Sequence, residues 1–335
     1  PYTLRRVLHL LDWVLRTYPG ADPDNVYATG GSMGGAGAAL LGLRHARHVN
    51  YVEATIGQTI ARNHRPSRQR QLAGLWGPLQ PGGAWDAQDL TALLRDDPLA
   101  RQQFLFLKHG KDDPTIHFGA VTFPSPVTGL SFYDALQTYG VGHMAVWDEG
   151  GHGSPDPALG EQWWTNGWNP VFDATAWLRR DVAFPAFHRS AADADHGGGE
   201  GNGARDFDPE RGYAGLVDRV GDTGWAGARA GCLNRALRWD ADQLVDDLDR
   251  FEIPLRVLDD GLPGEPPTGD RVARAAPFPV DVTLRRVQRF QTAPGERLRW
   301  AFGPARGEVT AGPDGAVTVP ALPVTTAWQT LSVTR

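Results

Sequence analysis

A serine bracketed by glycines constrains the fold of this chain more than any other feature. The segment Gly30-Gly31-Ser32-Met33-Gly34-Gly35 follows residues 25–29, which are typical of a short strand. It precedes residues 36–45, which are rich in alanine and leucine and typical of a close-packed helix. Small residues on both sides allow a sharp strand-to-helix turn that exposes the hydroxyl. The alternative is a glycine-rich turn with an incidental serine.

Short apolar runs alternate with helical patterns over the first half of the chain. Strands are expected at 25–29, 49–56, 104–108 and 143–147. Helices are expected at 3–16, 36–45, 90–94, 126–139 and 169–180, and 62–87 is expected to be a loop. Buried strands alternating with helices predict an α/β fold whose mostly parallel sheet is flanked by helices.

The pattern changes after residue 189. Residues 190–208 are small, polar and glycine-rich, which predicts a linker between a catalytic domain at 1–189 and a β-rich, sandwich-like accessory domain at 209–335. Strands are expected at 251–257, 280–290, 297–302, 308–310, 316–319 and 328–333. The second of these strands carries three arginines, Arg285, Arg286 and Arg289. We expect them to lie on a solvated face rather than to form an anion site.

Composition narrows the classes of partner. The chain has 335 residues, 41% of them apolar, which suffices for two domains. The net charge of −6 and the absence of a basic stripe argue against a nucleic-acid partner. No apolar run approaches the length of a membrane span, so no membrane association is expected. The single Cys232 excludes an intramolecular disulfide.

A carboxylate follows the expected strand at 104–108. The sequence His109-Gly110-Lys111-Asp112-Asp113-Pro114 resembles the His-Gly-x-x-Asp segment of many α/β-hydrolases, in which the last Asp orients the catalytic histidine. The resemblance implies that Asp113 is the acid of a Ser-His-Asp triad. Asp112 is the alternative acid. The alternative without a catalytic role is an Asx-turn at the end of the strand.

A histidine follows the next expected strand in a glycine-rich loop, Gly150-Gly151-His152-Gly153. A single loop histidine is more often a solvated surface group, but the order Ser, Asp, His and the strand-end positions favour His152 as the base. His152 would then take the proton of Ser32, and the backbone N–H of Met33 would supply one donor to the oxyanion hole.

The resemblance extends from Tyr2 to about Arg180. The segment from Asn25 to Gly35, together with His109-Gly110, Asp113 and Gly151-His152-Gly153, is similar to the polyhydroxybutyrate-depolymerase and feruloyl-esterase branch of α/β-hydrolases. Prolyl-oligopeptidase-type hydrolases share the serine turn. The resemblance implies a secreted or periplasmic serine esterase without cofactor or metal, acting on small or polymeric aryl, acyl-sugar or polyester substrates. The alternatives are a serine peptidase and an inactive polymer-binding fragment.

The chain departs from that family at its start. The family's sheet has several strands before the helix seen here at 3–16, and a loop among them gives the second oxyanion donor. The sequence begins with Pro1 inside this helical pattern, so we expect that an N-terminal portion of the natural protein is missing. A truncated sheet would expose an edge, which makes a homodimer the expected assembly.

Three further features have two interpretations each. The first is a group of three tryptophans after His152, which either form an aromatic platform for the substrate or pack the loop after His152: Trp163, Trp164 and Trp168. The acidic stretch 193–208 binds Ca²⁺ or, as we expect, is a linker. His109 and His117 near Asp113 suggest a metal only weakly, because the triad accounts for Asp113.

Overall fold

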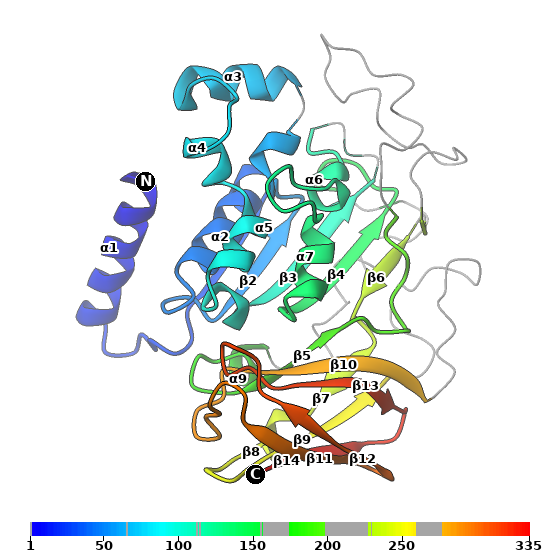
Figure 1. Ribbon diagram of the computed structural model, residues 1–335. Helices are drawn as coiled ribbons and strands as arrows, with labels where there is room; N and C mark the ends of the chain where they lie inside the picture. Colours follow the sequence, from blue (N-terminus) through cyan, green and yellow to red (C-terminus); the bar gives the residue numbers. More distant parts are fainter. Residues whose placement is uncertain are drawn as a thin grey trace.

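The structure is a computed structural model that describes residues 2–64, 66–111, 113, 115–154, 156, 174–197, 227–228, 230–258 and 277–335. Figure 1 shows an upper part built of strands and helices above a lower part built almost entirely of strands. Within the described residues, no helix is long and apolar enough to cross a membrane.

The upper part holds the strands and helices expected over residues 3–147, and three further α-helices among the described residues. In chain order its main elements are α1 (Tyr2–Thr17), β1 (Tyr27–Gly31), α2 (Met33–Arg44), β2 (Tyr51–Thr55), α3 (Pro66–Trp76), α4 (Gly83–Asp86), α5 (Leu90–Asp96), β3 (Phe104–Gly110), α6 (Gly119–Thr122), α7 (Phe132–Thr138) and β4 (Gly142–Asp148). The short helix α9 (Ala174–Trp177) lies beside the strands of the lower part (Figure 1), where Trp177 packs against Trp239.

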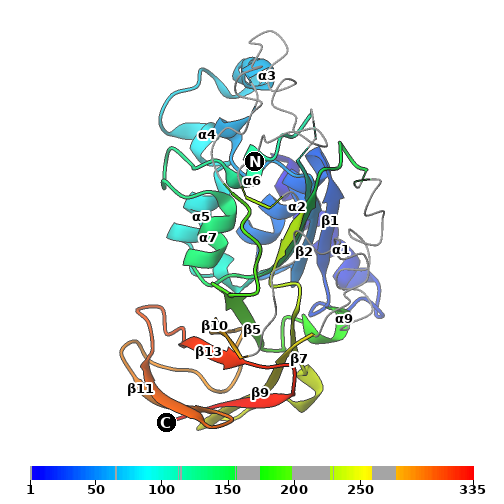
Figure 2. The same ribbon diagram turned by 90° about the vertical axis from the view of Figure 1, so that its right-hand side faces the viewer.

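The strands of the upper part form one sheet in the order β1-β2-β3-β4-β6, where β6 is Gly231–Leu233. The pairs β1–β2, β2–β3 and β3–β4 are parallel, and β4–β6 is antiparallel. Every residue of β3 and of β4 is buried, as expected for central parallel strands. Helices α2, α5 and α7 lie together on one face of the sheet (Figure 2), where they share a core with β1 to β4.

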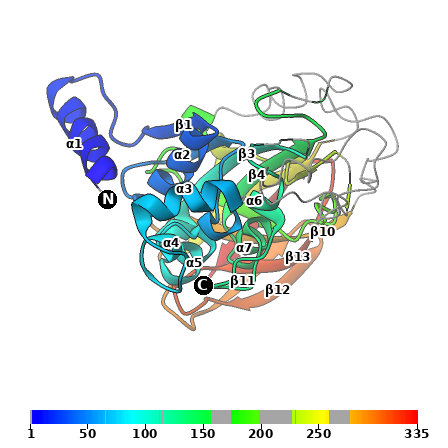
Figure 3. The same ribbon diagram turned by 90° about the horizontal axis from the view of Figure 1, so that it is seen from above.

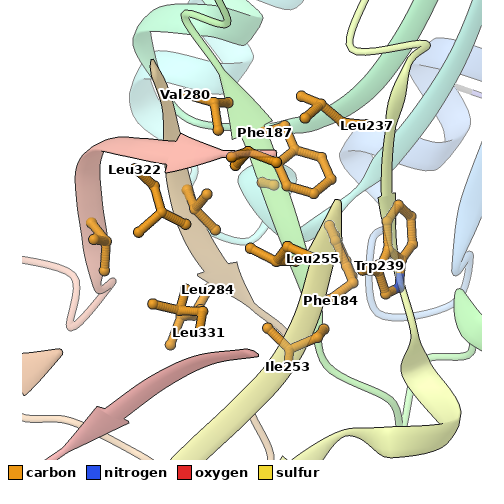
Figure 4. Packing of buried hydrophobic residues seen from close by; sticks show 14 of the residues in the cluster. Phe184, Phe187, Leu237, Trp239, Ile253, Leu255, Val280, Leu284, Leu322 and Leu331 are labelled. Carbon is orange, nitrogen blue, oxygen red and sulfur yellow. The ribbon is translucent and has the colours of Figure 1, made fainter. Parts of the chain in front are cut away.

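The lower part is a sandwich of two antiparallel sheets with the orders β13-β10-β5 and β12-β11-β14-β9-β7, and β8 pairs with β9. Its strands are β5 (Phe184–His188), β7 (Leu237–Trp239), β8 (Val245–Asp246), β9 (Arg250–Val257), β10 (Phe278–Arg285), β11 (Arg297–Phe302), β12 (Ala305–Thr310), β13 (Thr318–Val324) and β14 (Gln329–Thr334). Side chains of the two sheets interdigitate in one core, with Phe187 and Leu322 facing Leu255 and Trp239 (Figure 4).

The two parts exchange strands. β5 precedes the predicted linker but pairs with β10 of the sandwich, whereas β6 follows the linker and pairs with β4 of the upper sheet. Residues 190–197 of the predicted linker are held by backbone hydrogen bonds, from Ala191 N to Pro279 O (3.0 Å) and from Ala194 N to Cys232 O (3.0 Å). The chain therefore crosses between the parts three times, from β4 to β5, from β5 to β6 and from β6 to β7, which ties them into one unit.

The expectation of a loop over 62–87 is wrong, because α3 and α4 lie within it. Pro66 occupies the first position of α3, where a missing N–H costs nothing. Gly77, with φ 81°, follows its last residue in the left-handed conformation that ends many helices. Glycine and proline here mark the ends of a helix rather than a loop.

Two other element boundaries differ from expectation. The helix expected over 126–139 begins only at Phe132, because the side chain of Ser131 caps it by accepting from Asp134 N at 3.1 Å. The strand expected over 280–290 ends at Arg285, since Arg286 has φ 52° and leaves the extended conformation. Of the helix expected over 169–180, the described part contains α9.

The expectation that Arg285 and Arg286 face solvent is also wrong, because both are buried. Arg285 Nε donates to Gly140 O at 2.9 Å. Arg286 donates to the backbone oxygens of Gln102 (2.9 Å), Leu178 (2.7 Å) and Asn50. Burial lowers the pKa of Arg286 to about 9. Its guanidinium therefore joins the end of β10 to the upper part.

Replacing this arginine should loosen the junction. We expect Arg286→Leu to lower the free energy of unfolding by about 2–4 kcal/mol, because it leaves several buried carbonyl oxygens without a donor. The matched control is Arg289→Ala, whose side chain is exposed and pairs with Asp247, with an effect within about 0.5 kcal/mol. Urea unfolding followed by circular dichroism measures both. Equal losses for the two variants would contradict the assignment.

β1 is an edge strand with little protection. The order of the sheet leaves its outer side without a partner strand among the described residues. It contains no lysine, proline or bulge, whereas the edge strand β12 exposes Arg306 and Glu308. Helix α1 stands apart from the rest of the protein on the side of β1 (Figures 1 and 3), with Val7, Leu10 and Trp13 exposed. An unpaired edge therefore lies on the same side as an exposed apolar helix face.

We expect this edge to pair with the same edge of a second copy. Thr29→Lys, which places a charge on the exposed side of β1, should shift a concentration-dependent dimer toward monomer in light scattering after size exclusion. Thr310→Lys on the edge strand β12 is the matched control and should leave the dimer unchanged. A monomer at all concentrations in the unmodified chain would contradict this expectation.

Candidate active site

Ser32 lies in the turn between β1 and α2. Its backbone has φ 56° and ψ −122°, a conformation that residues other than glycine rarely adopt. Ser32 N donates to Thr55 O at 2.9 Å, and Ser32 O accepts from Ala36 N at 3.0 Å. These two bonds hold the strained residue between the end of β2 and the first turn of α2.

The glycines around Ser32 are required by close backbone contacts. A Cβ on Gly30 would collide with the carbonyl group of Gly34. A Cβ on Gly35 would lie 2.6 Å from Thr55 O, nearer than real Cβ atoms come. The turn that presents Ser32 can therefore form only with glycine at these positions.

Asp113 and His152 form a hydrogen-bonded pair at the ends of β3 and β4. His152 Nδ1 donates to Asp113 Oδ2 at 2.7 Å, which leaves Nε2 of the neutral imidazole as an acceptor. Asp113 is fully buried, and its other oxygen accepts from Thr115 N (2.7 Å) and Ile116 N (3.0 Å). The alternative acid, Asp112, lies outside the described residues.

Asp148 positions the loop that carries His152, and the sequence analysis missed it. Its Oδ1 accepts from Gly150 N at 2.8 Å and its Oδ2 from Asp156 N at 3.0 Å. Gly151 and Ser154 add a β-bridge across the loop. The signal was available, since a strand-end aspartate before two glycines is a turn former. Both ends of the loop are thus fastened to one buried carboxylate.

His109 links β3 to the serine turn. Its Nε2 donates to Gly57 O at 3.2 Å, and the Tyr133 hydroxyl lies 3.5 Å from its Nδ1. Burial lowers the pKa of His109 to about 4, so the ring is neutral at pH 7. Gly57 in turn lies against the first residues of α2, because a Cβ there would lie 2.7 Å from Ala36 N. Within the described residues, no group of three or more His, Cys, Asp or Glu side chains could hold a metal ion.

The three predicted triad residues lie at the carboxyl ends of the strands of the upper sheet. Ser32, Asp113 and His152 follow β1, β3 and β4, and the carboxyl ends of parallel strands meet on the same side. The structure joins Asp113 to His152, but among the described residues it records no hydrogen bond between Ser32 and His152. Met33 is the first residue of α2, whose leading N–H groups have no partner within the helix. Trp163, Trp164 and Trp168 lie outside the described residues.

A cavity of about 240 Å³ opens beside Ser32. Its walls are mainly apolar and come from α2, from α3 and from the segments that follow β2, α4 and β3. The residues that line it are Ser32, Met33, Ala36, Gly37, Leu40, Gln58, Ala61, His64, Arg68, Leu72, Trp76, Gln88, Leu90 and Ile116. A serine at a strained strand-to-helix turn, a nearby Asp–His pair and an adjoining apolar cavity are typical of serine hydrolases on α/β folds.

No protein-family model matches the chain, and no curated protein matches it. Among solved structures, an acylaminoacyl peptidase from Pyrococcus horikoshii aligns at 17% identity and TM-score 0.34, over 45% of this chain and 23% of its own. An S-formylglutathione hydrolase from Agrobacterium tumefaciens aligns at 22% identity and TM-score 0.33, over 43% and 48%. A ferulic acid esterase aligns at 20% identity and TM-score 0.32, over 45% and 53%. The chain thus spans about half or less of these structures.

Burial of neutral His109 should make stability depend on pH. Its pKa is about 4 in the folded chain and about 6.5 when unfolded, so between these values the unfolded state binds more protons. The contribution of neutral His109 to the free energy of unfolding is complete above pH 6.5. It is lost as the pH falls toward 4, at about 1.4 kcal/mol per pH unit. We expect His109→Gln to lose less stability than the unmodified chain between pH 7.5 and pH 5, by on the order of 2 kcal/mol.

Urea unfolding at the two pH values measures this difference. The control is His9→Gln on α1, whose side chain is exposed and should not change the pH dependence. An unchanged pH dependence in a folded His109→Gln would show that this ring takes up its proton equally in both states.

Proposed function

We propose that the chain is a serine hydrolase that cleaves carboxylic esters through Ser32, His152 and Asp113. The observation that carries the proposal is the strained Ser32 at the same sheet edge as the hydrogen-bonded Asp113–His152 pair. A backbone strained at one serine is a cost that the fold keeps where the hydroxyl must be presented. The buried carboxylate holds His152 in the tautomer that leaves Nε2 to accept a proton.

In the proposed reaction, Ser32 Oγ attacks the ester carbonyl while His152 Nε2 takes its proton. The oxyanion that forms is stabilised by the backbone N–H of Met33 at the start of α2. Collapse of the intermediate breaks the bond to the alcohol, which leaves with the proton from His152. Water, deprotonated by His152, then attacks the acyl-enzyme and releases the acid and free Ser32.

The His152 side chain is 31% exposed, so solvent reaches the ring from the open side of the site. Catalytic hydrogen bonds in empty sites are commonly long and shorten when substrate binds. We propose that the Ser32–His152 hydrogen bond forms in this way, when an ester enters the cavity and displaces water between the two side chains.

The proposed substrates are aryl esters, acylated sugars or polyesters. The mainly apolar walls beside Ser32 support an apolar acyl group, because burying such a group there removes apolar surface from water on both sides. The alcohol of an ester is a better leaving group than the amine of a peptide. An ester is therefore an easier substrate than a peptide for a site with one identified oxyanion donor.

Ser32→Ala tests the proposal. We expect the unmodified chain to hydrolyse 4-nitrophenyl butyrate and to be labelled by a fluorophosphonate, and Ser32→Ala to lose labelling and at least about 1,000-fold in kcat/KM. Ser332→Ala, in β14, is the control and should retain both. Faster turnover of a butyryl anilide than of the ester would favour a peptidase. A folded chain without turnover or labelling would contradict the proposal and favour a binding module.

A further inference from the structure

The shape of the cavity beside Ser32 is set by two helices. Met33, Ala36 and Leu40 line it from successive turns of α2, and Leu72 and Trp76 line it from α3. Helix α3 stands above the carboxyl ends of the strands (Figures 1 and 2). Its own residues from 68 to 76 are at most partly buried, so it forms the outer wall of the cavity.

Helix α3 is held in this position at both ends. Gln69 donates its side-chain amide to Arg62 O at 2.7 Å. At the other end, the Trp76 ring meets the buried Trp85 edge to face, with centroids 5.2 Å apart. Trp85 Nε1 donates to Gly77 O at 3.1 Å, directly after the helix. The side chains that α3 turns toward the cavity are therefore placed by fixed contacts.

One cation lines this mainly apolar cavity without a counter-charge. Arg68 lies one helical turn before Leu72 on the same face of α3, and no aspartate or glutamate is among the described residues that line the cavity. Its recorded partner is the neutral Gln71 Oε1, at 2.8 Å. By contrast, Arg62 and Asp86 pair with each other just outside the lining. The guanidinium thus keeps donors for an anion that enters the cavity.

We propose that this cavity binds the acyl part of half-esters of dicarboxylic acids, with Arg68 pairing with the free carboxylate. The inference rests on the proposed function, and it adds the chemistry of the acyl group. Arginine presents a planar fork that matches a carboxylate in two parallel hydrogen bonds. The apolar walls between Ser32 and α3 take the spacer that separates this carboxylate from the ester carbonyl.

The size of the cavity sets the length of the spacer. Its volume of about 240 Å³ corresponds to roughly eight water volumes, which suits an acyl group of about six to nine non-hydrogen atoms, the carboxylate included. Hydrolysis of such a half-ester consumes one water and yields the dicarboxylate and the alcohol, with Ser32 carrying the acyl group in between. Half-esters of this kind are the chain ends of polyesters made from a diacid and a diol.

A matched pair of substrates tests the role of Arg68. Mono(4-nitrophenyl) adipate and 4-nitrophenyl hexanoate share the leaving group and the six-carbon acyl chain and differ in the terminal carboxylate. We expect the unmodified chain to favour the adipate in kcat/KM by roughly tenfold, and Arg68→Gln to abolish this preference by lowering turnover of the adipate more than that of the hexanoate. Arg68→Lys should restore part of it. Arg70→Gln, exposed on the same helix, is the matched control.

A binding measurement separates this inference from the proposed function. Monoethyl adipate should quench tryptophan fluorescence of Ser32→Ala, through Trp76 in the cavity wall, at a concentration at least about tenfold lower than for Ser32→Ala/Arg68→Gln. Equal effects of Arg68→Gln on both esters, or equal binding by the two variants, would overturn the inference and leave esterase activity intact. Binding that depends on Arg68 in a chain without turnover would overturn the proposed function alone.

Discussion

The candidate site depends on how closely the backbone of the β1–α2 turn approaches itself and β2. Gly30 and Gly35 have no room for a Cβ, and the strained Ser32 is held from both sides by Thr55 O and Ala36 N. A side chain at either glycine would push α2 away from the sheet. The same displacement would move Met33 N–H and the cavity wall of α2, so the nucleophile, the proposed oxyanion donor and the acyl site depend on one set of backbone contacts.

A second constraint gathers the other residues. Parallel strands end at a common edge, and each of β1, β3 and β4 is followed there by one member of the proposed triad. The loops are fixed by buried polar groups, since Asp148 fastens the His152 loop and neutral His109 fastens Gly57. The sandwich below supports this sheet from its far end, through β5, β6 and the buried Arg286. The arginine pairs with carbonyl oxygens and needs no acidic partner, so nothing in its sequence neighbourhood indicated burial.

The local pattern of apolar residues was sufficient to predict an element where the same residues form the strand and fill the core. The strands around 104–108 and 143–147 were predicted because strands buried on both faces are continuously apolar, and β3 and β4 extend each by only a few residues. The predictions were wrong where single residues at the end of a helix decide where that helix begins or ends. Residues 62–87 were expected to be a loop, but Pro66 and Gly77 mark the two ends of α3. The helix expected from residue 126 begins only after Ser131, whose side chain caps it. The short strands β5 and β6 were missed because three to five residues carry too little periodicity.

The sequence by itself determined that Ser32 sits at a glycine-rich turn between a strand and a helix, and that Asp113 and His152 follow later strands, in the order Ser, Asp, His that is typical of α/β-hydrolases. Those features are local, because turn chemistry and apolar runs act over a few residues. Only the tertiary structure decided that Asp113 bonds His152, that α3 closes a cavity over Ser32, and that Arg68 lines it without a carboxylate. These depend on contacts between segments far apart in the chain, and the spacing of residues along a sequence does not determine such contacts.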